Sequence, residues 1–353
     1  MNPVLNVGSN GSDSRLSSPV GKGKAAPPSR LTNPLFPSLE RPLANVEAML
    51  QSELQSSIPY VDELLQYVGT LSGKRMRPSL LFLAADAAGE IVDDHVVLAS
   101  VIEMIHIATL VHDDILDGAD TRRHKVTVNQ KYGNQSSVLL GDYLFTHSFY
   151  LASTLETTFA CRRIGQATNR VCAGELHQVG NAGNLALAED AYYEIIRGKT
   201  AELCACATAL GAHYAGADEA TCAALEEYGM QLGVAFQIAD DLLDLTGDEA
   251  KTGKSQGTDV EKQKLTLPVI HLLREGPKSA VDEAMSILAS ADGSPESLAR
   301  LRGLMEASGS LEYARNAAIT AADLAAAQLD CLPESEAKAT LQGLTRFVVA
   351  RTH

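Results

Sequence analysis

The stretch Leu110–Lys125, LVHDDILDGADTRRHK, places Asp113, Asp114 and Asp117 directly after an apolar run. On a helix, side chains four residues apart lie on one face, roughly 5–6 Å apart at Cβ, so Asp113 and Asp117 share a face. Two carboxylates placed in this way repel each other unless a cation lies between them. The stretch therefore predicts a helix end that binds a divalent cation, with a solvated acidic helix end as the alternative.

A second stretch, Phe236–Gly247, FQIADDLLDLTG, repeats the spacing D-D-x-x-D with Asp240, Asp241 and Asp244. Both copies are embedded in apolar sequence, where a bare carboxylate is costly, and this favours the metal site over the acidic helix end. Mg²⁺ prefers oxygen ligands and is usually held by one or two carboxylates together with substrate phosphates. We therefore expect two facing helices that clamp a diphosphate through Mg²⁺, with Mn²⁺ as the alternative ion.

The composition limits the class of protein. The chain has 353 residues, a formal net charge of −15 and 45% hydrophobic residues with no Trp. Abundant Ala and Leu favour helix over strand, and the acidic balance argues against nucleic acid or an anionic membrane as a general partner. No apolar run reaches the roughly 18 residues of a membrane span, so we expect no transmembrane segment. Six scattered cysteines without zinc-finger spacing suit a reducing compartment, and we expect a cytoplasmic protein.

The chain divides into a tail and one domain. Residues 1–36 are rich in Ser, Gly, Pro and Asn and show no hydrophobic period, so we expect a disordered tail. It has no apolar core and is not a secretory signal, but its few acids and scattered basic residues also suit an organelle transit peptide. Residues 37–353 carry apolar residues at helical spacings, without strand-like alternation of any length. We expect one all-α domain of ten or more helices, over 40–57, 59–71, 79–89, 95–117, 135–160, 162–181, 192–211, 219–246, 267–274, 278–290, 294–307, 309–329 and 333–350.

Two groups of basic residues stand near the first aspartate stretch. The loop 72–78, SGKRMRP, carries Lys74 and Arg77 between Gly and Pro, and predicts either an anion-binding loop or an ordinary surface cluster. Arg122 and Arg123 follow the three aspartates closely, and Arg suits planar, multidentate contact with phosphate. Local cations of this kind could bind an anionic ligand on an acidic protein.

Other polar residues are open to two interpretations. His106 lies two turns before the first aspartates on the same face, either as a satisfied core histidine or as a substrate contact. Gly198-Lys199-Thr200 invites a phosphate-binding P-loop, but Tyr193 stands where that motif needs glycine. We expect Lys199 to project toward the site from a helix kinked at Gly198, with a solvated lysine as the alternative.

The segment 246–270, rich in Gly and charge, follows the second aspartate stretch and carries Lys254 and Lys264. Loops of this kind over a concave site can act as lids. Gln237 lies one turn before Asp240 on the preceding helix, within reach of the same site. We therefore expect the segment to cover the aspartates.

The chain resembles the trans-polyprenyl diphosphate synthases, the isoprenyl chain-elongating prenyltransferases. The motifs that carry the resemblance are GKRMRP (73–78), HDDILDGADTRR (112–123), GKT (198–200), FQIADDLLD (236–244), GK (253–254) and KLTLP (264–268). The resemblance implies an all-α fold of mostly antiparallel helices around a central cavity, a catalytic domain over 37–353 and a homodimer. Two departures are Ser72, where a second glycine is frequent, and the tail, which has no counterpart in the family.

The resemblance also implies a role for each candidate residue. Two or three Mg²⁺ ions would be held by Asp113, Asp117 and Asp240, supported by Asp114, Asp241 and Asp244. The allylic diphosphate would contact Arg122, Lys199, Lys254 and Lys264. Isopentenyl diphosphate would contact Lys74, Arg77, His106 and Arg123. The allylic cation would be stabilised by the oxygen dipoles of Thr200 and Gln237.

Product length depends on the apolar wall beside the first aspartate helix. In this family a bulky aromatic residue just before D-D-x-x-D gives short products, whereas here Ala108 and Thr109 are small. Ile105 lies one turn deeper and is apolar but not aromatic. We expect a product longer than C20 from a farnesyl or geranylgeranyl starter, in the range of quinone side chains.

Other functions fit the residues less well. A terpene cyclase normally has a second metal motif of an Asn/Ser/Glu type, whereas this chain repeats D-D-x-x-D. A non-catalytic subunit of a heteromeric synthase usually has degraded aspartate motifs, and both motifs are intact here. A geranylgeranyl or farnesyl diphosphate synthase remains the alternative at shorter chain length.

Overall fold

The structure, a computed structural model, describes residues 36–71, 73–246 and 257–350. Most of this described chain is helical, which confirms the all-α prediction. The first half contains α1 (Glu40–Glu53), α2 (Pro59–Gly69), α3 (Met76–Ala88), α4 (Asp93–Leu116), α5 (Val128–Tyr132), α6 (Asn134–Ala152), α7 (Phe159–Gly180) and α8 (Glu189–Ile196). The second half contains α9 (Glu202–Tyr214), α10 (Glu219–Thr246), α12 (Thr258–Glu261), α13 (Leu267–Glu275), α14 (Lys278–Ser290), α15 (Pro295–Ala307), α16 (Ser310–Ala327) and α17 (Glu336–Ala350).

Shorter elements link the long helices. They are the 3₁₀ turns η1 (Pro37–Leu39) and η3 (Gln328–Cys331), the π-helical turn η2 (Arg197–Ala201), and the two-residue strands β1 (Thr121–Arg122) and β2 (Lys125–Val126). The predicted tail lies outside the described residues except for Phe36. The Phe36 side chain is only 1% exposed and packs into the core.

Two predicted helices end earlier than expected. The helix predicted over 40–57 ends at Glu53, and Pro59 begins the next helix. A residue before proline is disfavoured in the helical region, and Ile58 is extended accordingly. The prediction of one helix over 135–160 is also wrong at its end, because α6 stops at Ala152. The hydroxyls of Ser153 and Thr154 donate to carbonyls three residues earlier, which satisfies the chain in a turn instead of a helix.

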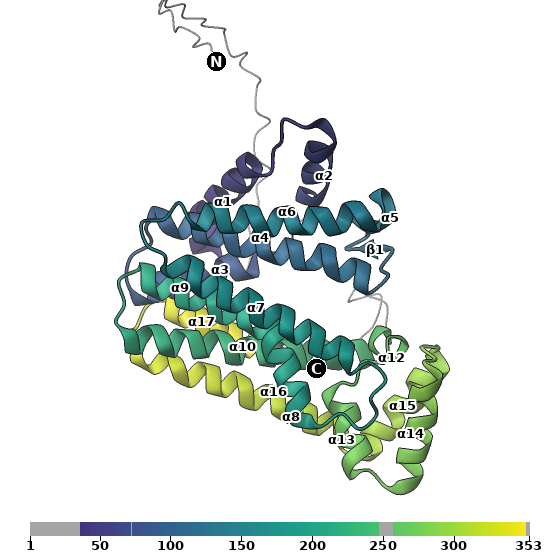
Figure 1. Cartoon of the computed structure of the whole chain (residues 1–353). Coiled ribbons are helices and arrows are strands. Elements are labelled where there is room, and N and C mark those ends of the chain that lie inside the picture. Colours follow the sequence, from purple (N-terminus) through teal and green to yellow (C-terminus); the bar gives the residue numbers. More distant parts are fainter. Residues whose placement is uncertain (1–35, 72, 247–256, 351–353) are drawn as a thin grey trace, which may run out of the picture.

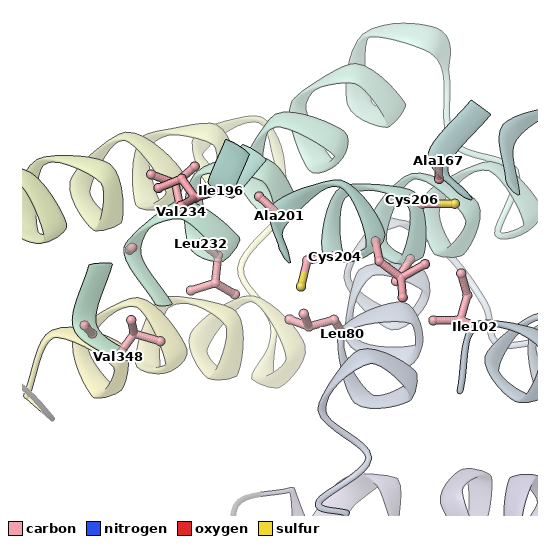
Figure 2. Packing of buried hydrophobic residues seen from close by; sticks show 14 of the residues in the cluster. Leu80, Ile102, Ala167, Ile196, Ala201, Cys204, Cys206, Leu232, Val234 and Val348 are labelled. Atoms are coloured by element: carbon pink, nitrogen blue, oxygen red, sulfur yellow. The ribbon is translucent and has the colours of Figure 1, made fainter. Parts of the chain in front are cut away.

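The core lies between the long helices. α10 packs against α9 and α16, α3 packs against α9, and α4 packs against α6. Figure 1 shows α4, α6, α7 and α10 running along the molecule, with β1 and α12 toward the same end of it. Figure 2 shows Leu80 of α3, Ile102 of α4, Cys204 of α9 and Leu232 of α10 in this buried cluster. These packed helices form the scaffold that carries both aspartate motifs.

Helix α4 is the most apolar of these elements. By length and composition alone it could cross a membrane, with a mean hydropathy of 1.6 over its best window, but 67% of that window is buried inside the fold. A helix that is apolar on every side belongs either in a membrane or in the core of a large protein. Its burial against α3 and α6 accounts for its composition.

Candidate active site

The first aspartate motif ends helix α4 beside a cleft of about 270 Å³. Asp113 and Asp117 both line the cleft, as the spacing predicts, together with Glu175 and Val179 of α7. Asp114 points elsewhere. It is 1% exposed and accepts a hydrogen bond from Arg122 Nε at 2.8 Å. The motif therefore presents two carboxylates to the cleft, and the third anchors an arginine.

A small hairpin gives Arg122 its place. Strands β1 and β2 pair antiparallel, with Arg122 opposite Lys125, and the two turn residues have positive φ angles of 51° and 62°. Turns of this geometry match the twist of paired strands. The hairpin turns the chain back after α4, so Arg122 reaches the carboxylate that precedes it by eight residues.

Three lysines face the carboxylates of the first motif. Lys264 Nζ lies 2.9 Å from Asp117 Oδ1, and Lys262 Nζ lies 3.3 Å from Asp117 Oδ2. Burial raises the pKa of Asp117, but these lysines outweigh that effect and hold it below its usual value. Lys199 Nζ pairs with Glu175 at 3.0 Å. Lys199 also lines the cleft with Asp113 and Asp117, in the direction that the sequence predicts.

Lys199 projects from the π-helical turn η2, where a kinked helix was expected. Gly198 is the reason that this turn can pack against α7, since a Cβ there would lie 2.8 Å from the Arg170 carbonyl oxygen and 3.1 Å from Gly174 Cα. π-helical turns are rare and frequently occur at functional sites. Burial lowers the pKa of Lys199, but Asp113 and Glu175 outweigh it and raise the pKa above its ordinary value. Lys199 is therefore a firmly charged cation in the cleft.

The second aspartate motif lies near the end of α10, with its partners on other elements. Tyr192 of α8 donates to Asp241 Oδ2 at 2.6 Å, and Gln237 Nε2 donates to Asp241 Oδ1 at 2.7 Å. Asp244 accepts from Thr258 Oγ1 at 2.7 Å and from the backbone N–H of Asp259 at 3.2 Å. Burial raises the pKa of Asp241 well above its usual value. Among the described residues, neutral donors thus hold Asp241 and Asp244 in place.

Thr200 and Gln237 are also in direct contact. Thr200 Oγ1 donates to Gln237 Oε1 at 2.6 Å, and Gln237 in turn donates to Asp241. The oxygen dipoles predicted to face a carbocation therefore belong to one hydrogen-bonded chain. This chain lies against a second cavity of about 80 Å³, whose lining includes Gln237, Asp241 and Asp259. Burial and repulsion by Asp244 raise the pKa of Asp259 to about 7.

The two cavities adjoin each other. Lys199, Lys264 and Gln178 line both of them, so the same lysines stand between the first and second aspartate motifs. The tertiary structure thus brings together two stretches that lie more than a hundred residues apart in the sequence. This is the arrangement that the repeated D-D-x-x-D spacing predicts.

The donor set fits Mg²⁺ bound together with a diphosphate. Among the residues that the structure describes, no three His, Cys, Asp or Glu side chains converge to hold a metal unaided. Mg²⁺ rarely uses such an all-protein cage and takes one or two carboxylates plus substrate phosphates. Asp113 and Asp117 supply hard oxygen donors, and the nearby lysines supply charge for the remaining phosphate oxygens. Asp240 lies on α10 one turn before Asp244.

A separate basic cluster surrounds His106, which lies about two turns before the aspartates on α4. Burial lowers the pKa of His106 well below its usual value, and Arg77 and Arg123 lower it further. Arg123 lies against Gly73, where a Cβ would overlap its guanidinium, and Arg123 Nη1 donates to the Leu71 carbonyl at 2.9 Å. Arg77 Nε is buried without a hydrogen-bond partner in the described part of the chain. This guanidinium nitrogen is therefore available to a ligand.

The remaining candidates divide between the two sites and the core. Lys74 is exposed in the basic loop, and Lys254 lies outside the described residues. Ala108 and Ile105 are completely buried on α4, and the partly buried Thr109 donates to the His106 carbonyl. These three residues lie one to two turns before Asp113, as the product-length hypothesis requires.

Sequence reasoning did not assign roles to several residues that line the site. These are Glu175 and Gln178 of α7, Tyr192 of α8, and Asp259 and Lys262 of the segment before α13. Glu175 and Gln178 share a helical face at a spacing of three, and Lys262 lies two residues from Lys264. Both spacings are visible in the sequence, but only the tertiary structure brings these side chains next to the aspartates.

Comparisons with known proteins agree with this geometry. The model of the polyprenyl synthetase family matches residues 58–305. Octaprenyl diphosphate synthase of Escherichia coli (strain K12) is 35% identical over 309 residues, which cover 88% of this chain and 95% of that protein. A decaprenyl diphosphate synthase from Rhodobacter capsulatus has a TM-score of 0.86 at 37% identity, over 91% of this chain and 99% of that one.

A polyprenyl synthase from Caulobacter crescentus, complexed with calcium and isoprenyl diphosphate, has a TM-score of 0.85 at 33% identity. The match covers 93% of this chain and 100% of that one. Family and fold therefore agree over most of the chain. The chain belongs to the polyprenyl synthetase family and is a trans-prenyltransferase.

Proposed function

We propose that this protein condenses isopentenyl diphosphate onto an allylic diphosphate and makes an all-trans polyprenyl diphosphate longer than C20. The observation that carries the proposal is the cleft in which Asp113, Asp117, Lys199 and Lys264 meet beside the second aspartate motif. Carboxylates alone would repel a diphosphate, so the lysines and the metal that the carboxylates hold make the cleft suitable for one. The product serves quinone side-chain or other isoprenoid synthesis.

In this reaction the C–O bond of the allylic diphosphate breaks and its electron pair leaves with the diphosphate. Asp113 and Asp117 would hold Mg²⁺, which would supply positive charge for the leaving group. Lys199, Lys264 and Arg122 neutralise part of the charge that develops on this group, and preorganised charge of this kind is a major source of catalysis. The double bond of isopentenyl diphosphate then forms the new C–C bond, and a proton is lost. Thr200 and Gln237 hold oxygen dipoles toward the intermediate cation.

Isopentenyl diphosphate binds in the basic cluster of Lys74, Arg77, His106 and Arg123. The buried and unpartnered Arg77 Nε supports this assignment, as does the concentration of guanidinium groups around His106. The neutral imidazole of His106 can donate a hydrogen bond without adding charge. The two diphosphates thus occupy separate sites, one at the aspartates and one around His106.

The small residues before the first motif support a long product. Ala108 and Thr109 leave no aromatic barrier next to Asp113, and relatives of this chain include octaprenyl and decaprenyl diphosphate synthases. Farnesyl or geranylgeranyl diphosphate is the starter. A geranylgeranyl or farnesyl diphosphate synthase is the shorter-chain alternative that sizing of the product tests.

The proposed assembly is a homodimer in the cytoplasm. Helix α6 exposes three large apolar side chains, Val138, Leu139 and Tyr150, at 44%, 61% and 64%. An apolar helix face of this kind suits burial against a second copy. All six cysteines are free thiols, which suits a reducing compartment.

The direct test is condensation with sized products. The purified protein is incubated with isopentenyl diphosphate, farnesyl diphosphate and Mg²⁺, with EDTA as the control, and the dephosphorylated alcohols are sized by mass. We expect a Mg²⁺-dependent product of C25 or longer. A product that stops at C20 would keep the chemistry and contradict the chain-length proposal, whereas no condensation by folded protein would contradict the function.

Replacement of Ala108 tests the tunnel beside α4. Ala108→Phe places a large ring one turn before the aspartates, and we expect a product shorter by one or more isoprene units. Ala108→Ser is the matched control, because it adds only one atom and should leave the product length unchanged. An unchanged product from Ala108→Phe, with activity retained, would place the growing chain elsewhere.

A further inference from the structure

Arg75 differs from the other cations of the basic loop. It stands between Lys74 and Arg77 in the sequence, yet it is 9% exposed, whereas Lys74 is exposed to solvent. Its guanidinium donates to two carboxylates from different helices, Glu47 of α1 and Glu103 of α4. Nη1 lies 2.6 Å from Glu103 Oε1 and Nη2 lies 3.1 Å from Glu47 Oε2, while Nε also donates to Glu47. The charge of Arg75 is therefore paired with carboxylates of the protein itself.

The backbone of Arg75 is equally constrained. Its φ and ψ angles are 51° and 39°, the left-handed conformation that residues with a side chain adopt only at a steric cost. The Arg75 carbonyl accepts the first hydrogen bonds of α3, from Ser79 N at 3.0 Å and Ser79 Oγ at 2.8 Å. The chain thus turns at Arg75 from the loop that carries Lys74 directly into the helix that carries Arg77. The ion pairs of its side chain hold this turn.

The carboxylate of Glu103 also lies near other cations of the basic cluster. Glu103 lies one turn before His106 on α4, close enough for its charge to affect Arg123. Arg77 and Arg123 in turn lie close to His106. If Arg75 did not bind Glu103, this carboxylate would face the guanidinium groups that an incoming diphosphate needs. An internal anion in that position would compete with the substrate.

We propose that Arg75 is a positioning residue for the isopentenyl diphosphate site, which it serves without touching the substrate. It does so in two ways: it fixes the left-handed turn between Lys74 and Arg77, and it occupies the carboxylates of Glu47 and Glu103. The proposal rests on the proposed function, because it assumes that the basic cluster binds isopentenyl diphosphate. It assigns the middle residue of the loop a task distinct from those of its neighbours.

A second buried arginine offers a matched control. Arg163 of α7 is 7% exposed and also binds two carboxylates, Glu202 and Glu226, each at 2.9 Å. It lies inside a regular helix, and its partners lie on α9 and α10. The two arginines therefore share burial and pairing but differ in place, since only Arg75 stands in the basic loop. Loss of a buried ion pair as such should affect both in the same way.

The experiment compares Arg75→Lys with Arg163→Lys. We expect Arg75→Lys to raise the KM for isopentenyl diphosphate about tenfold and to leave the KM for the allylic diphosphate within about twofold, as is typical of residues that orient ligands. Arg163→Lys should lower the Tm about as much as Arg75→Lys does, but it should change neither KM. Equilibrium binding of isopentenyl diphosphate alone, without Mg²⁺ or allylic substrate, should weaken by the same factor for Arg75→Lys only.

A pair of further variants separates backbone from charge. Arg75→Gly accepts the left-handed turn but leaves both carboxylates unpaired, so we expect at least as large a loss of isopentenyl diphosphate binding. Adding Glu103→Gln to Arg75→Gly removes the unpaired carboxylate of Glu103. This double variant should recover part of the lost isopentenyl diphosphate binding. If Arg75→Lys does not fold, Glu47→Gln removes the negative charge and one of the two acceptor oxygens that Glu47 offers to Arg75, and should raise the same KM severalfold.

Three results would overturn the inference. They are an unchanged isopentenyl diphosphate affinity in folded Arg75→Lys, an equal rise of both KM values, and an equal effect of Arg163→Lys. Wild-type protein that neither binds nor condenses isopentenyl diphosphate would instead overturn the proposed function. If the wild type and the Arg75 variants bind isopentenyl diphosphate equally tightly, the proposed function stands and only the role of Arg75 is overturned.

Discussion

The two aspartate motifs have the same spacing but different surroundings. In the first motif Asp117 is held by Lys262 and Lys264, and Asp114 by Arg122. In the second motif the aspartates that correspond to them accept hydrogen bonds from neutral groups. Tyr192 and Gln237 donate to Asp241, and Thr258 donates to Asp244.

The difference teaches how one pattern can have two roles. Cations keep the pKa of Asp117 low, and a diphosphate can compete with Asp117 for the same lysines. Burial keeps the pKa of Asp241 high. Its donors are neutral, so an anionic substrate does not attract them as it attracts the lysines. We interpret the first motif as the one whose lysines change partner, from Asp117 to the diphosphate, when the substrate binds. In the second motif Asp241 keeps its hydrogen bonds when the substrate binds. Three substitutions test this contrast.

The largest effect should come from Asp117→Asn. The change removes the carboxylate that faces the cleft and both lysines, and with it one donor for the metal. We expect kcat/KM to fall about 10³-fold, the order of a lost charge-stabilising contact in a transition state. Inorganic pyrophosphate with Mg²⁺ should raise the Tm of the wild type but not that of the variant, because a ligand stabilises only the protein that binds it.

Asp86→Asn is the matched control for this prediction, since Asp86 is exposed on α3 away from both cavities. It should retain wild-type activity and the Tm increase with pyrophosphate. Near-wild-type activity in Asp117→Asn would remove the first motif from the reaction and invert the comparison.

Tyr192→Phe should have an intermediate effect on the second motif. The variant keeps the ring but removes the hydroxyl that donates to Asp241, so a buried carboxylate loses a donor. We expect a 10- to 100-fold fall in activity, of the order of other supporting contacts, and a loss of about 1–3 kcal/mol of stability. Urea unfolding and steady-state kinetics measure the two quantities.

Tyr193→Phe makes the comparison specific. Its ring centroid lies 5.7 Å from that of Tyr192, and it is only partly buried, so the same chemical change is made next to the site. It should alter neither activity nor stability appreciably. Equal effects of the two Phe variants would argue against a special role for the hydroxyl on Asp241.

The smallest effect should follow Lys262→Met. Lys262 lies 3.3 Å from Asp117 and is about one-third exposed, so its loss leaves Lys264 in place. We expect about a five- to tenfold higher KM for the allylic diphosphate, with kcat and Tm nearly unchanged, because one of several charge contacts is lost. The KM for isopentenyl diphosphate should stay the same, which ties Lys262 to the first motif.

Lys278→Met, on the exposed first turn of α14, controls for the loss of a surface charge. If Lys262→Met leaves the allylic KM unaltered, the lysine binds Asp117 only in the absence of substrate. The first motif would then rely on Lys199 and Lys264 alone.

The sequence by itself determined the local features of this protein. Periodic apolar residues predicted the long helices correctly, and the D-D-x-x-D spacing placed Asp113 and Asp117 on one face of α4. Both results follow from interactions between residues three or four apart, which the sequence states directly. The ends of the helices near residues 53 and 152 were missed because serine, threonine and a following proline compete with the helix there.

The tertiary structure decided which groups meet. Lys264 and Asp117 lie 147 residues apart, Tyr192 and Asp241 lie 49 apart, and Arg75 joins helices on either side of it in the sequence. The π-helical turn at Lys199 likewise depends on how closely Gly198 and Gly174 pack. Such pairings, and the burial that sets the pKa of each carboxylate, arise only when the helices pack around one core. The same four-residue spacing therefore places Asp117 against lysines in one motif and, within the described residues, Asp241 and Asp244 against neutral hydrogen-bond donors in the other.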